Sequence, residues 1–161
     1  LLVDSVTAIR AGMHRAGVER LVIVQGVHIA FEGDPRNPGL LLLKAVLGVA
    51  MRPLTLDGRA LGAFLAQDLG QWTVIRMPRL AEGPTTSGAL VGRLRVSPRS
   101  KVTSGDVGAF ALRLVERGEQ VRRMPMIASA NGRAAGDAER LHPHYSIDAR
   151  GQAAQRPHSA H

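Results

Sequence analysis

Apolar residues recur every three or four positions at the start of the chain: Leu2, Val6, Ile9, Met13 and Ala16. This spacing predicts a helix over residues 2–16 with one apolar face. Gly17 follows, where a helix end favours a residue that adopts positive φ. The continuous apolar run Leu21–Val24 predicts a strand that is covered on both faces of a parallel sheet. A helix, a short glycine turn and a buried strand are half of a βαβ unit, which indicates the α/β class.

The middle of the chain alternates loop, helix and strand. Its Pro and Gly residues predict a loop over 27–39, and the apolar run 40–51 predicts a buried or interface helix. Pro53 stands where a helix can begin, so 54–70 is expected to form a second helix. A second buried strand is expected over 72–76.

The helix with the clearest signals comes later in the chain, after an expected loop over 77–90 and a short strand near 91–96. Thr103 is followed three residues later by Asp106, which fits a capping box at a helix start. Gly118 stands where this helix is expected to end.

The hydrophobic pattern and the composition change near the end of the chain. The segment 121–128 predicts a final strand, at a sheet edge because Pro125 has no N–H to donate. From residue 131 onward no sustained period is present, and this composition predicts a disordered tail. The expected organisation is one folded unit over 1–130 and a tail over 131–161.

The composition fits a single domain with an aliphatic core, because 45% of the 161 residues are hydrophobic and only 3% are aromatic. The absence of cysteine excludes a disulfide framework and a thiolate metal site. The apolar runs are too short for a membrane span, and the N-terminus lacks the order of a signal peptide. A cytoplasmic protein without a membrane partner is therefore expected. The chain opens inside an amphipathic pattern without an initiating Met, so we expect the sequence to be N-terminally incomplete.

The net charge of +8 is carried almost wholly by arginine, since the only lysines are Lys44 and Lys101. The basic residues are scattered, and the densest stretches, 92–101 and 122–123, have no aromatic residues beside them for base stacking. Nucleic-acid binding is therefore not favoured. The histidines of the tail have no partners at a defined ligand spacing, so no metal site is predicted.

Three stretches stand in a characteristic order: "HRAGVERLVIVQG" (14–26), "DGRALGAFLAQDLGQWTVIRMPRLAEGP" (57–84) and "VTSGDVGAFALRLVE" (102–116). Together they resemble the C-terminal half of atypical short-chain dehydrogenase/reductases, closest to the NAD(P)H-binding NmrA-like and flavin reductase (biliverdin-IX-beta reductase)-like proteins. The resemblance covers about residues 3–128. It implies a partial Rossmann-like fold, the C-terminal half of a doubly wound parallel sheet, with a disordered C-terminal tail.

The positions that match the family's motifs are Asp57, Trp72, Thr73, Val74, Ile75, Arg76, Pro78, Thr103, Asp106 and Val107. The chain also departs from the family pattern. Gly62 stands where the family has a helical Glu, and the Tyr-x-x-x-Lys pair of typical members is absent, since the only tyrosine is Tyr145. No G-x-G-x-x-G occurs, so the strand, turn and helix that hold a pyrophosphate are missing from this sequence.

Two groups of residues are expected at the cofactor. Gln25 and Gly26 end the first strand, where ligands of open α/β sheets bind. The resemblance implies that Pro78, Arg79 and Leu80, just after the second strand, contact the nicotinamide ring of NADP or NAD. Arg79 also suits an anionic substrate or a phosphate.

A small-molecule substrate is expected beside the cofactor. The resemblance implies that the loop 81–90 covers this substrate, and we assign Glu82 and Thr85 to it. His28, just beyond the first strand, suits an acid–base role at the substrate if it faces the cleft. No catalytic residue is assigned.

Two classes of function fit these observations. The resemblance implies an oxidoreductase-type NAD(P)H-binding domain which, in the complete family fold, reduces a small electrophile by hydride transfer. The alternative is a non-catalytic NmrA-like regulatory module, or a truncated remnant without independent activity. Besides the substrate, the expected partner is the missing N-terminal segment or a second copy of the chain.

Overall fold

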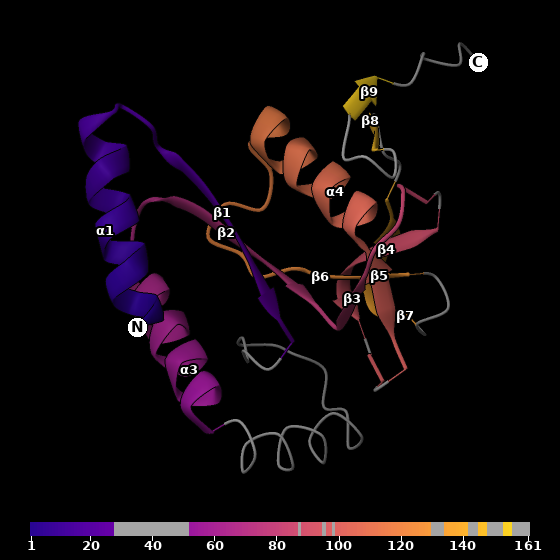
Figure 1. The fold of residues 1–161 in the computed structure, drawn as a ribbon, viewed down its shortest axis with the longest axis horizontal. Coiled ribbons are helices and arrows are strands. Elements are labelled where there is room, and N and C mark those ends of the chain that lie inside the picture. Colours follow the sequence, from indigo (N-terminus) through magenta and orange to yellow (C-terminus); the bar gives the residue numbers. More distant parts are fainter. Residues whose placement is uncertain are drawn as a thin grey trace.

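The computed structural model describes residues 1–27, 52–86, 88–94, 96–97, 99–129, 134–141, 145–147 and 153–155. The elements are α1 (Leu2–Arg15), β1 (Arg20–Gly26), α3 (Arg52–Gln67), β2 (Gln71–Met77), β3 (Arg79–Ala81), β4 (Ala89–Leu94), β5 (Lys101–Thr103), α4 (Ser104–Arg117), β6 (Met126–Ser129), β7 (Ala134–Arg140), β8 (Tyr145–Ile147) and β9 (Ala153–Gln155). Figure 1 shows their arrangement. The predicted helix 40–51, the loop 27–39 beyond Val27 and the predicted site residue His28 lie outside the described residues.

The main sheet has five strands in the order β1-β2-β6-β4-β7. β1, β2 and β6 are parallel, whereas β4 is antiparallel to both β6 and β7. Helices alternate with the parallel strands along the chain, as the hydrophobic pattern predicts. The predicted α/β, Rossmann-like class is therefore confirmed, with an antiparallel pair added at one side of the sheet.

The two faces of the sheet have separate apolar cores. On one face, α1 and α3 bring Val6, Leu61 and Leu65 against Trp72 and Val74 of β2. On the other face, α4 packs against alternate residues of the strands, and its core side chains are Val107, Phe110 and Leu114, set against Ile75, Val91 and Ile127. Figure 1 shows α1 and α3 on one side of β1 and β2, with α4 on the other. β2 is buried almost throughout because it is covered on both faces.

Glycine residues end two helices as the sequence predicts. Gly17 has a φ of +66° directly after the α1 C-cap, and the nearby Val18 amide donates to the Met13 carbonyl at 2.9 Å. Gly118 has a φ of +61° and ends α4 in the left-handed region. An L-residue with a side chain rarely adopts this conformation, which is why glycine stands at both positions.

β1 differs from the prediction of a strand covered on both faces. None of its residues is buried, and Val24 is 41% exposed. Within the described part of the chain β1 pairs with β2 alone, so its other edge has no strand beside it. The apolar run Leu21–Val24 is typical of an interior parallel strand, yet here it lies at the edge of the sheet.

The predicted edge position for the strand after Pro125 is wrong. β6 lies between β2 and β4, inside the sheet. The proline precedes the first paired residue, Met126, so its missing N–H falls outside the ladder. Its carbonyl accepts a hydrogen bond from the Arg76 amide at 2.9 Å, which joins it to β2.

The disordered tail expected from residue 131 contains strands. β7 pairs with β4 in antiparallel register, and the Leu141 amide that follows it donates to the Ala89 carbonyl at 2.8 Å. Leu141 is fully buried in the core beneath α4. Backbone hydrogen bonds to a neighbouring strand do not require a hydrophobic period, so the sequence pattern gives no sign of this pairing. β8 and β9 form a further short antiparallel pair.

None of the helices in the described ranges is long and apolar enough to cross a bilayer.

Candidate functional site

The carboxyl ends of β1 and β2 lie side by side. The parallel register places Gln25 beside Arg76 and Gly26 beside Met77, and the Val27 amide donates to the Met77 carbonyl at 2.9 Å. Gln25 and Gly26 are both partly exposed. The structure therefore brings the predicted residues of the first strand next to the segment that precedes Pro78. Ligands of open α/β sheets bind at this edge.

β3 continues from this edge after a single residue, Pro78. The sequence predicts a loop here, but Arg79–Ala81 is a short strand that pairs in parallel with β5. Arg79 is exposed, and Leu80 is 49% exposed. Figure 1 shows β3 and β5 beside the carboxyl end of β2. The predicted cofactor residues from both strands are thus gathered at one end of the sheet.

Arg76 is part of the interior rather than of this edge. Its side chain is buried, and its Nε donates to the Met124 carbonyl at 2.8 Å. The hydrogen bond links β2 to the segment that enters β6. Of the structural and functional interpretations of Arg76, the structure favours the structural one.

Thr85 lies in the predicted substrate loop, but its side chain is turned into the protein. It is buried, and its hydroxyl donates to the Gly105 carbonyl at 3.3 Å. Its hydroxyl is used inside the fold, which argues against the predicted substrate contact. Glu82, also assigned to the substrate, is exposed directly after β3.

Asp106 fastens the same loop to the start of α4. The completely buried carboxylate accepts one hydrogen bond from the Thr86 amide at 2.6 Å and another from the Thr86 hydroxyl at 2.8 Å. The predicted cap at Thr103 is present, since its hydroxyl accepts from the Asp106 amide at 3.1 Å. The Thr103 half of the predicted capping box is thus confirmed, whereas both carboxylate oxygens of Asp106 hold a loop from elsewhere in the chain.

Gly105 allows the loop and the helix to meet backbone to backbone. A Cβ atom at this position would collide with the backbone of Pro84 and Thr85. The Gly105 amide donates to the Gly83 carbonyl at 3.0 Å, which closes the contact. The loop 82–86 is therefore held against the start of α4, directly after β3. Sequence reasoning missed this contact, and its only sign is a glycine in the first turn of a well-capped helix.

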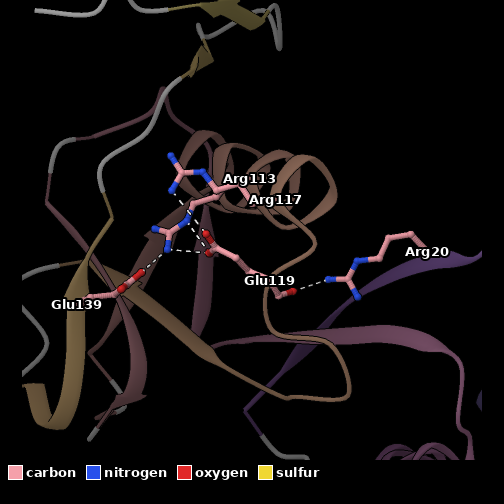
Figure 2. Close-up of polar contacts among 5 residues, drawn as sticks. All are labelled: Arg20, Arg113, Arg117, Glu119 and Glu139. Carbon is pink, nitrogen blue, oxygen red and sulfur yellow. Dashed lines mark hydrogen bonds and ion pairs between the residues drawn. The ribbon is translucent and has the colours of Figure 1, made fainter.

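A second polar cluster lies at the other end of the sheet. Figure 2 shows Arg113 between two carboxylates, at 2.9 Å from Glu119 and 2.6 Å from Glu139. Burial lowers the pKa of Arg113, but its hydrogen bonds to Glu119 and Glu139 outweigh this effect and raise the pKa overall. These contacts connect the end of α4 with β7.

Arg20, at the start of β1, reaches the same cluster. Its Nη2 donates to the Glu119 carbonyl at 2.8 Å and to the Thr73 hydroxyl at 2.7 Å. Its Nε and Nη1 are buried without a hydrogen-bond partner, and burial lowers the pKa of Arg20. The cluster joins β1, β2 and α4 far from the carboxyl ends of the strands, which gives it a structural role.

A cavity of about 620 Å³ opens at this amino end of the strands, between the end of α1 and the turn before β2. Arg10 and Leu69 are among its lining residues, and none of the predicted site residues lines it. Arg10 is held there by an ion pair with Asp68 at 2.7 Å. Among the described residues, no three His, Asp or Glu side chains gather in a way that would hold a metal ion.

Comparison with known proteins adds a family match. The model of a family described as NAD(P)H-binding matches residues 3–117. No curated protein matches the sequence. A solved structure from Burkholderia pseudomallei, named only as a candidate exported protein, has a TM-score of 0.57 and 24% identity over 79% of this chain. At this identity the likeness shows the fold alone.

Two further solved structures are more distant. A candidate NADH-flavin reductase from Streptococcus pneumoniae has a TM-score of 0.48 and 15% identity over 70% of this chain. A Rossmann-fold NAD(P)-binding family protein from Shigella flexneri has a TM-score of 0.40 and 16% identity over 78% of this chain. This chain spans 63%, 57% and 53% of the length of the three structures, in the order given.

Proposed function

Because this chain belongs to the NAD(P)H-binding family, we propose that it is an oxidoreductase-type domain that receives the nicotinamide end of NADP or NAD at the carboxyl ends of β1 and β2. The observation that carries the proposal is the register that sets Gln25 and Gly26 beside Arg76 and Met77, with β3 directly beyond. Open parallel sheets bind dinucleotides at this edge. Within the family, the match of Trp72–Arg76 supports the NmrA-like and flavin-reductase-like branch.

Three residues at this edge suit the flat dihydronicotinamide ring, which is uncharged in the reduced cofactor. Gly26 has no side chain, which lets a ring approach the backbone closely. Pro78 and Leu80 offer apolar contacts, and Leu80 is about half exposed. The loop 82–86, which is held against α4, follows β3 directly. When bound, the cofactor supplies a hydride, and the chain's own residues orient the ring and exclude water.

The pyrophosphate half of the cofactor has no matching site in this sequence, because no Gly-rich turn stands between a strand and a helix. In the described part of the chain no strand lies on the outer edge of β1, and this edge indicates where such a strand belongs. Parallel addition of a strand there would place its carboxyl end beside Gly26. We therefore propose that the site is completed by a further segment at this edge, either from a longer form of the chain or from a second copy.

A non-catalytic, regulatory role is the second candidate, and one observation favours it. The side chains of Gln25, Pro78 and Leu80 cannot exchange protons, and the carboxylate of Glu82 lies exposed after β3. A domain of this kind would bind the dinucleotide without turning over a substrate. Hydride transfer to a small electrophile is the first candidate because nicotinamide reductases obtain their chemistry from the cofactor.

The proposal is tested by titrating the 161-residue chain, and a form extended at its N-terminus by a dinucleotide-binding strand, turn and helix, with NADH and NADPH. Nicotinamide fluorescence reports binding. We expect the extended form to bind, and Gly26→Val to weaken its affinity about tenfold or more because the side chain occupies the ring's place. Leu69→Ala, at the far end of the sheet, is the control and should bind normally. If neither form binds, or if Gly26→Val binds like the parent, the proposed site is wrong.

A further inference from the structure

Two cations are fixed side by side at the proposed site. Arg79 on β3 and Lys101 on β5 are register partners in a parallel pair. Register partners project their side chains from the same face of a sheet, so the two cations are neighbours. Both residues are exposed. Like charges in such a pair repel each other, and this arrangement destabilises a sheet unless something offsets it.

The rest of the fold prevents the pair from moving apart. β5 leads directly into α4, whose first turn holds residues 82–86 through Asp106 and Gly105. β3 precedes that loop, and the Arg79 amide donates to the Ser100 carbonyl at 3.4 Å. The two strands are thus fastened at both ends, and the backbones of Arg79 and Lys101 stay in register.

No carboxylate neutralises the pair within the described part of the chain. The ion pairs formed there involve neither Arg79 nor Lys101. Glu82 comes directly after the last residue of β3, and it forms no ion pair with Arg79 or Lys101. Arg99, exposed in the turn before β5, adds a further positive charge to the segment. The pair is therefore a local excess of positive charge at the carboxyl end of β2.

We propose that Arg79 and Lys101 together bind an anionic group, a carboxylate or a phosphate, of the ligand that occupies this edge of the sheet. An arginine guanidinium and a lysine ammonium side by side match two oxygens of such a group. The inference rests on the proposed function for its place and adds the ligand's chemistry: an anionic substrate, or a phosphate of the dinucleotide.

The direct test uses backbone amide NMR of the full chain titrated with inorganic phosphate and with succinate, against sodium chloride at equal ionic strength. We expect shifts at residues 79–81 and 101–103 with both anions but not with chloride. Arg79→Gln or Lys101→Gln should each weaken binding about fivefold, and the double variant should abolish it. Arg59→Gln, an exposed arginine on α3, is the matched control and should bind normally.

Two results would overturn the subsite: shifts that chloride reproduces, or an Arg79→Gln, Lys101→Gln double variant that binds like the parent. Addition of NADPH separates the two sources of the anion. If NADPH competes with inorganic phosphate, the pair binds a phosphate of the cofactor. If NADPH and inorganic phosphate bind at the same time, the pair binds the substrate. If phosphate binds at the pair but neither dinucleotide binds to an extended chain, the subsite stands and the proposed function fails.

Discussion

At the scale of single residues, glycines and one aspartate decide how the candidate site is built. Gly105 lets the loop 82–86 lie against the backbone of α4, and the buried Asp106 holds that loop with two hydrogen bonds. The sequence predicts the cap at Thr103 but not the loop that Asp106 holds, because a capping pattern describes only contacts within one turn. The partner lies 20 residues away along the chain.

Two glycines in helices should respond in opposite directions to the same substitution. Gly105→Ala should destabilise the protein by about 1–3 kcal/mol, because the new Cβ collides with the backbone of Pro84 and Thr85. Gly12→Ala should stabilise it by about 0.5–1 kcal/mol, since a Cβ there meets no atom closer than 4.0 Å and alanine favours the helix. Urea unfolding of both variants measures the difference. Equal effects would show that the loop does not pack on α4 as described.

Among the elements, the sequence predicts every described helix and the strands β1, β2, β4 and β6. Periodicity is strong for α1 and α4 because each buries one face. Periodicity does not predict a strand that is stabilised by backbone hydrogen bonds to its neighbour rather than by burial of its side chains. β3 and β7 lie in segments rich in polar, Gly and Pro residues, and they form because a neighbouring strand offers free hydrogen-bonding groups. Pro125 before β6 led to the wrong prediction of an edge strand for the same reason. The place of a strand in a sheet depends on which strands pair with it.

The segment after residue 131 is therefore expected to matter for stability. Leu141→Ala should cost about 2–5 kcal/mol, because the side chain is fully buried in the core under α4. Leu69→Ala, a substitution of the same kind at an 84% exposed position, should change stability by less than about 0.5 kcal/mol. Chemical denaturation compares the two. A neutral Leu141→Ala would mean that the chain after β6 is the dispensable tail that its composition suggests.

For the molecule as a whole, the residues that the structure describes form a sheet with one open side. β1 is apolar, and in the described part of the chain no strand covers its outer edge. The sequence predicts the two strands, and the structure has their ends side by side because parallel strands share their carboxyl edge. It cannot show that β1 is the outermost of the described strands at this side, since an apolar run looks the same in an interior strand and an uncovered one.

The open edge should make the 161-residue chain associate with itself. Exposed apolar edge strands pair with other chains, and a charged side chain on the edge suppresses this. We expect sedimentation analysis to show association that rises with concentration, and Val24→Lys to shift the population toward the monomer. Ala60→Lys, an exposed position on α3, adds the same charge elsewhere and should leave association unchanged. A parent chain that stays monomeric over the same concentrations would contradict the open edge.

The central claim is that a nicotinamide dinucleotide binds at the carboxyl ends of β1 and β2. Mapping of backbone amide shifts on the N-terminally extended chain during titration with NADH and NADPH tests it most directly. We expect the largest shifts at Gln25, Gly26 and Val27 and at residues 79–81, with none around the cavity lined by Arg10 and Leu69. Shifts confined to that cavity, or no shifts with either dinucleotide, would contradict it.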